Sequence, residues 1–127
     1  MIKVKTIFFL LFTVIVSSCY YDIEEELYPQ NNVNCDTAGT TLSQKIKPIL
    51  SKSCYMCHSA ANAGNMGAGI NLETYNDLKK YVDNSKFIMS IKHSAGVSAM
   101  PKGTTNKIPY CDIVLIDYWI SKGAKND

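Results

Sequence analysis

The most informative part of the chain is Cys54-Tyr55-Met56-Cys57-His58, two cysteines separated by two residues and followed directly by a histidine. Positions i, i+3 and i+4 of a helical turn lie on one face. We therefore expect Cys54, Cys57 and His58 to present two thiols and one imidazole together, while Tyr55 and Met56 point elsewhere. This face indicates a site at which two sulfur atoms and one nitrogen act on a single bound group.

The spacing is that of c-type haem attachment. The two thiols can add to the two vinyl groups of one porphyrin, and the imidazole of His58 then lies under the iron. Two other interpretations remain. A thioredoxin-like redox pair requires a βαβ setting, which the sequence does not show. A zinc site would need Cys35, Cys111 or His93 as further ligands, at spacings that are long and irregular for a zinc knuckle.

The apolar pattern around the motif predicts helices and no convincing alternating strand. Segments rich in Gly, at 60–69 and 95–107, are expected to be loops. The chain is therefore expected to be a small all-α domain of four or five short helices, with a thin core that a large apolar cofactor would complete. The first expected helix runs from a cap at Thr41 or Ser43 to about Leu50, and Pro48 is expected to end or kink it. The other expected helices cover 53–58, the segment from a cap at Thr74 to Val82, 85–92 and 109–121.

This order of features resembles the class I cytochromes c, in which a Met-bearing loop precedes a C-terminal helix with an aromatic residue, here Trp119 in a core position. More narrowly, Lys47-Pro48-Ile49-Leu50 and Met100-Pro101 are similar to short monohaem lipoprotein cytochromes. The resemblance implies one covalently attached haem c, with His58 as the proximal iron ligand and a loop Met as the distal one. It also implies electron transfer without catalytic residues, through transient docking to redox protein partners.

Met100 is the preferred distal ligand. A thioether suits low-spin haem iron and raises its reduction potential, and Pro101 favours an extended conformation at Met100. Met66, in the Gly-rich loop, and His93, which would make a bis-His site, are the alternatives. A five-coordinate haem that acts as an enzyme or binds a gas or peroxide is the alternative function, and a haem-free zinc-binding lipoprotein is a third.

The N-terminus has the layout of an export signal. Residues 1–18 hold a basic start, an apolar run too short for a comfortable membrane span, and two small residues. Val16-Ser17-Ser18-Cys19 resembles the lipobox of bacterial lipoproteins, which implies that Cys19 is lipidated. We expect residues 19–34 to be an acidic tether and 35–127 the cytochrome c-like domain. The expected location is the cell envelope, lipid-anchored, facing the periplasm or the surface, with the outer membrane as the expected membrane.

The charge and cysteine content narrow the function further. The formal net charge is only +2, and all 13 basic residues are Lys. Arg is the usual side chain for bidentate phosphate and base contacts, so the composition argues against nucleic-acid binding.

Lipidation at Cys19 and haem attachment at Cys54 and Cys57 leave two cysteines without a role, Cys35 and Cys111, an even number in an oxidising compartment. This pair is a departure from the broader family, but the class I-like arrangement packs the two terminal helices together, so we expect a disulfide between Cys35 and Cys111. Two separate buried thiols are the alternative.

Overall fold

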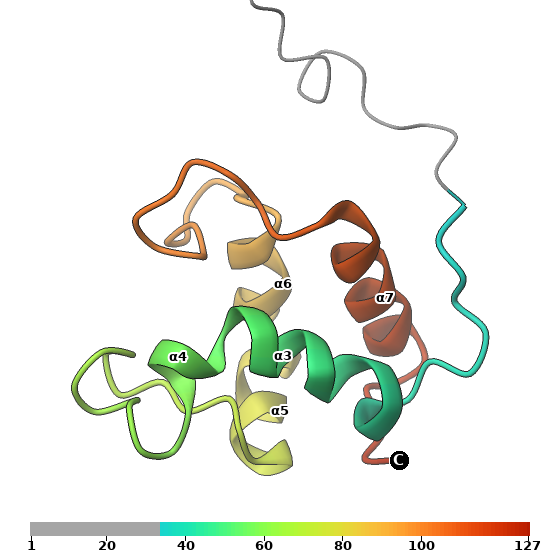
Figure 1. Cartoon of the computed structure of the whole chain (residues 1–127), viewed down its shortest axis with the longest axis horizontal. Helices are drawn as coiled ribbons and strands as arrows, with labels where there is room; N and C mark the ends of the chain where they lie inside the picture. The colour runs from blue at the N-terminus through green and yellow to red at the C-terminus, as the bar shows by residue number, and fades with distance from the viewer. Residues whose placement is uncertain (1–33) are drawn as a thin grey trace, which may run out of the picture. The chain divides into compact units, whose positions relative to one another are not determined.

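The computed structural model describes residues 34–127 (Figure 1). Within this range the secondary structure is helical and contains no strand, which confirms the expected small all-α domain. The predicted signal segment, Cys19 and nearly all of the tether lie outside the described residues. None of the helices between residues 34 and 127 has the length and apolar character that a membrane span requires.

In chain order the elements are the π-helix η1 Leu42–Ile46 and the α-helices α3 Lys47–Ser53, α4 Tyr55–His58, α5 Tyr75–Asp83, α6 Lys86–Ile91 and α7 Tyr110–Ser121.

The first helical segment is longer than the sequence predicts. Thr41 caps it, because its Oγ1 accepts the backbone N–H of Gln44 at 3.1 Å. The wider turns of η1 give way to the regular turns of α3 at Lys47. Pro48 therefore lies in the first turn of α3, where a missing N–H is tolerated. The predicted end near Leu50 is wrong, and α3 continues to Ser53 (Figure 1).

The remaining helices lie close to their predicted positions. Thr74 caps α5 as expected, since its Oγ1 accepts the backbone N–H of Asp77 at 3.2 Å. Pro109 immediately precedes α7, and Gly123 follows its end with a φ of 95°. The two Gly-rich segments form long loops, one between α4 and α5 and the other between α6 and α7 (Figure 1).

The core is apolar throughout and has Trp119 among its most buried side chains. Trp119 is 2% exposed, and its indole Nε1–H donates to the carbonyl of Lys125 at 3.0 Å. η1 packs against α7 and α6 also packs against α7, so the first and last helices share one core, as the resemblance to class I cytochromes c implied. The buried cluster comprises Leu42, Ile46, Ile49, Leu50, Leu72, Leu78, Val82, Phe87, Ile91, Ile108, Ile113, Ile116, Trp119 and Ala124.

The segment after α7 folds back on the first helix. The backbone N–H groups of Leu42 and Ser43 donate to the side-chain Oδ1 and the carbonyl of Asp127, both at 2.9 Å. The hydroxyl of Tyr75 donates to the carbonyl of Ala124 at 3.0 Å. Asp127 thus supplies acceptors for N–H groups that the start of a helix leaves unpaired, and it lies beside the start of η1 (Figure 1).

A disulfide bond joins Cys35 to Cys111, with 5.4 Å between their Cα atoms and a sequence separation of 76. Cys35 precedes η1, and Cys111 lies in the first turn of α7. Beside it, the Nζ of Lys45 donates to the carbonyl of Asp36 at 2.9 Å and so holds the Cys35 segment against η1. The bond confirms the predicted pairing of these two cysteines.

Candidate functional site

The Cys54–His58 turn begins where α3 ends. Cys54 lies between α3 and α4, and its carbonyl accepts the backbone N–H of Cys57 at 3.1 Å and that of His58 at 2.8 Å. Both cysteines are free thiols and half-buried. Short backbone bonds to a single carbonyl place Cys54, Cys57 and His58 on one helical turn, so the structure brings together the three residues that the motif singled out.

Burial controls the chemistry of the first thiol. Cys54 packs against the apolar core, and this burial raises the pKa of its thiol to about 11. The group is therefore a neutral thiol at neutral pH. A dithiol redox pair acts through a thiolate, which the surroundings in such sites stabilise by lowering the pKa of the cysteine. The surroundings of Cys54 do the opposite.

His58 is held by the segment that leads into α5. Its Nδ1 lies 2.8 Å from the carbonyl oxygen of Ile70, and its own carbonyl accepts the backbone N–H of Leu72 at 2.8 Å. A carbonyl only accepts, so Nδ1 carries the proton and Nε2 keeps its lone pair. The imidazole is thus fixed in orientation and in tautomer, with the nitrogen that can bind a metal left available.

Gly67 allows the loop between α4 and α5 to lie directly on the motif. A Cβ at this position would come within 2.5 Å of the Cys57 carbonyl oxygen and 2.9 Å of His58 Nδ1. The same loop is tied to the turn at Asn62, whose side-chain amide donates to the carbonyl of Met56 at 2.9 Å. The loop therefore forms a close cover over one side of the turn, which any side chain larger than hydrogen at Gly67 would disturb.

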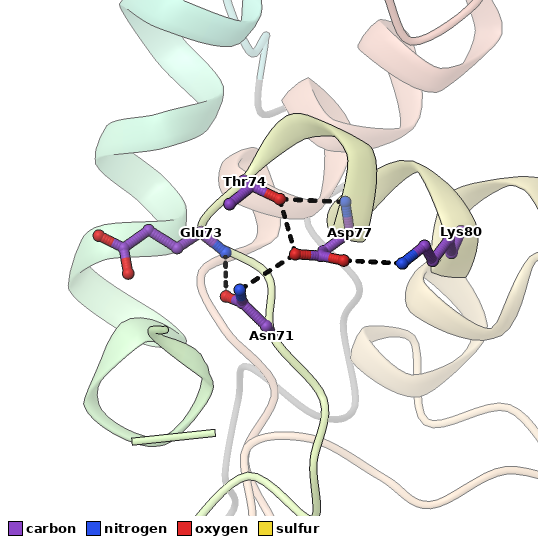
Figure 2. Close-up of polar contacts among 5 residues, drawn as sticks. All are labelled: Asn71, Glu73, Thr74, Asp77 and Lys80. Carbon is purple, nitrogen blue, oxygen red and sulfur yellow. Dashed lines mark hydrogen bonds and ion pairs between the residues drawn. The ribbon is translucent and has the colours of Figure 1, made fainter. Parts of the chain in front are cut away.

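A polar cluster fixes the end of that loop at the start of α5, and Figure 2 shows its bonds. Asp77 Oδ2 accepts from the hydroxyl of Thr74 at 2.7 Å and from the amide of Asn71 at 3.1 Å. Asp77 Oδ1 accepts from Lys80 at 2.8 Å. The hydrogen bond from Lys80, followed by that from Thr74, lowers the pKa of Asp77. The cluster anchors the residue that directly follows Ile70 to the first turn of α5.

Glu73 links this cluster to the motif from the other direction. Its backbone N–H donates to Asn71 Oδ1 at 2.9 Å, while its carboxylate points away from the cluster (Figure 2). That carboxylate accepts the backbone N–H of Ala60 at 2.7 Å. The bond between Ala60 and Glu73 thereby closes the loop near its two ends, so that Ile70 contacts His58 from a restrained segment.

The structure places the candidate distal ligands in different settings. Met100 is half-buried in the loop between α6 and α7, and its backbone N–H donates to the carbonyl of Ser90 at 3.1 Å. Met66 is 59% exposed on the loop after α4. His93 uses Nε2 to contact the carbonyl of Met100 at 3.0 Å. Because that carbonyl only accepts, Nε2 of His93 carries a proton and is not free to bind iron.

The zinc interpretation loses its additional ligands in this structure. Cys35 and Cys111 are joined to each other and are not thiolates. No group of three or more His, Cys, Asp or Glu side chains within residues 34–127 is placed to hold a metal ion. The predicted lipidation site, Cys19, lies outside the described residues.

The sequence did not single out Gly67 or Ile70. Gly67 is one of several small residues in a loop whose composition distinguishes none of them, and Ile70 acts through its carbonyl, a group that every residue has. No protein-family model, curated protein or solved structure matches this chain. The interpretation of the site rests on its donor set: two free thiols and one oriented imidazole nitrogen on a single turn.

Proposed function

We propose that this chain is an electron carrier that holds one haem c, attached at Cys54 and Cys57 and ligated by His58 and Met100. The observation that carries the proposal is the 2.8 Å hydrogen bond from His58 Nδ1–H to the Ile70 carbonyl. It leaves the Nε2 lone pair on the same turn as two free thiols. A pair of thiols for two vinyl groups and one imidazole for iron is the donor set that haem c requires.

The polypeptide has separate tasks in this function. When bound, the haem supplies an iron centre that passes single electrons. The carbonyl of Ile70 orients the imidazole of His58 and raises its basicity as a ligand. Gly67 lets the covering loop close against that imidazole. With His58 and Met100 both on iron, no position remains for a substrate, which favours electron transfer over catalysis.

We propose that residues 1–18 direct export, that Cys19 carries a lipid anchor in the cell envelope, and that redox proteins dock transiently on the domain. Small residues directly before a cysteine at the end of an apolar segment support the anchor. Fractionation of cells that express a Cys19→Ser variant tests it, because the variant should leave the membrane fraction.

Covalent attachment is tested by extracting the exported protein with acidified acetone. Haem should stay with the wild-type polypeptide, since thioethers survive this treatment. Cys54→Ser and Cys57→Ser should each weaken retention, and His58→Ala should prevent a six-coordinate site. The matched control is the double variant Cys35→Ser, Cys111→Ser, which removes two cysteines outside the motif and should retain haem. Free extraction of haem from the wild-type protein would show that the proposal is wrong.

The distal ligand is tested by the visible and near-infrared spectra of the same protein. The ferric form should show the weak near-infrared sulfur-to-iron band of Met ligation. Met100→Ala should abolish this band and open the iron to carbon monoxide. Met66→Ala is the control, because the exposed Met66 side chain should leave the band unchanged. Persistence of the band in Met100→Ala would assign the ligand elsewhere, and a wild-type high-spin spectrum that responds to carbon monoxide would favour the five-coordinate alternative.

A further inference from the structure

His93 occupies an unfavourable backbone position at the end of α6. Its φ is 55°, in the left-handed region that favours glycine. The N–H of His93 donates to the carbonyl of Ser90 at 3.2 Å, and the N–H of Ser94 donates to the carbonyl of Met89 at 2.9 Å. This is the Schellman pattern of helix ends, in which the left-handed residue is usually Gly. A histidine at this position costs backbone energy that Gly would avoid.

The side chain of His93 gives a reason for this choice of residue. Its Nε2–H donates to the carbonyl of Met100 at 3.0 Å. On the other side, the N–H of Met100 donates at 3.1 Å to the carbonyl of Ser90, the same carbonyl that accepts the N–H of His93. Both backbone polar groups of Met100 are therefore held by the end of α6, the N–H by Ser90 in its last turn and the carbonyl by His93, two residues beyond the helix. Both His93 and Met100 are half-buried.

We propose that His93 is a positioning residue for Met100, and this inference rests on the proposed function. By holding the Met100 carbonyl, His93 limits the movement of the loop between α6 and α7 and keeps the thioether available to iron. Loss of one such hydrogen bond should make replacement of the thioether by an external ligand roughly five- to tenfold easier. The contact with Met100 accounts for a histidine at a left-handed position where Gly would be less strained.

His93→Gly separates this role from a structural one, because Gly suits the left-handed backbone but removes the imidazole. In the exported, haem-loaded protein we expect an unchanged or raised midpoint of denaturant unfolding. At the same time the sulfur-to-iron band should weaken, and ferric iron should bind azide roughly five- to tenfold more tightly. His93→Gln restores a side-chain N–H donor and should recover part of the band. A merely structural His93 would leave the azide affinity at the wild-type value.

Ser85→Gly is the matched control. Ser85 also has a left-handed backbone, with a φ of 61°, but it lies at the other end of α6 and makes no side-chain cap. Relieving the strain there should leave azide binding unchanged. If His93→Gly and Ser85→Gly bind azide with equal affinity, the positioning role is refuted.

Amide hydrogen exchange at Met100 tests the same contact without depending on haem. His93→Gly should speed exchange of the Met100 N–H by a similar factor, whereas Ser85→Gly should not. Faster exchange with an unchanged sulfur-to-iron band would overturn the proposal, because the contact would then hold the loop without serving the ligand. If the wild-type protein lacks covalent haem, the proposed function fails, and unaltered exchange in His93→Gly would separately show that the His93 contact does not restrain Met100.

Discussion

His58 and His93 carry their protons on opposite ring nitrogens, and a backbone carbonyl decides each case. Ile70 accepts from Nδ1 of His58 and leaves Nε2 with its lone pair, whereas Met100 accepts from Nε2 of His93. The ring nitrogen that carries the proton in each histidine is thus determined by a neighbouring backbone carbonyl and not by another side chain. At this scale the two histidines differ in role because of which nitrogen meets a carbonyl.

Gly67→Ala should destabilise the domain, because its Cβ would collide with the Cys57 carbonyl and the His58 ring. We expect the free energy of unfolding to fall by about 1–3 kcal/mol, as for other overpacked sites. Urea unfolding of the exported protein measures this. Gly64→Ala is the control in the same loop, since a Cβ there would have no atom within 4 Å. Equal stability of the two variants would contradict the close approach at Gly67.

At the scale of elements, the start of α5 connects helix capping to the candidate site. The Oγ1 of Thr74 accepts the backbone N–H of Asp77, as an N-cap side chain does, and the same hydroxyl donates to the Asp77 carboxylate. Asn71 joins the same carboxylate and directly follows Ile70, whose carbonyl holds His58. The cap therefore stabilises α5 and also restrains the loop that orients the imidazole.

Thr74→Ala should lower the free energy of unfolding by about 1 kcal/mol, the usual cost of losing an N-cap hydroxyl. Chemical denaturation measures the loss, and Thr74→Ser, which keeps the hydroxyl, should be close to the wild type.

The pKa of Asp77 is lowered in the folded protein, so its contribution to the free energy of unfolding is present above its ordinary pKa and is lost as the pH falls through the folded value. The destabilisation by Asp77→Asn should therefore shrink in acid; a difference that stays constant down to about pH 2 would argue against the ionised carboxylate as its source.

For the whole molecule, contacts between distant parts of the chain close the domain at its ends. The disulfide joins the segment before η1 to the first turn of α7, and Asp127 accepts from the first N–H groups of η1. η1 and α7 share the core between these ties. A domain this small has a thin core and gains a large part of its stability from such cross-links.

The double variant Cys35→Ser, Cys111→Ser should lose up to about 4 kcal/mol of unfolding free energy, because the bond closes a loop with a sequence separation of 76. Urea unfolding under non-reducing conditions measures the loss. Each single variant should lose about as much as the double one, since either removes the same bond. Wild-type protein whose Cys35 and Cys111 are both alkylated after unfolding without reductant would refute the disulfide.

Most of the helices could be predicted from local pattern, because capping and periodicity depend on neighbours a few residues apart. Thr74 caps α5 and the Gly-rich segments are loops, as predicted, and α7 begins one residue after the predicted start at Pro109. Pro48 is the exception. A proline inside an α-helix usually ends or kinks it. Here the π-helix η1 precedes Pro48, which therefore lies in the first turn of α3, where no backbone N–H is needed.

The sequence by itself determined the all-α class and the placing of Cys54, Cys57 and His58 on one turn, because spacings of three and four residues act within a single helix. Haem attachment and the role of Met100 stay predictions from that pattern. Only the tertiary structure decided that Ile70 holds His58, that Gly67 must lack a side chain, and that His93 contacts Met100. Each of these contacts ends on a backbone group, and backbone groups are nearly the same in every residue, so only the path of the folded chain selects which one is used.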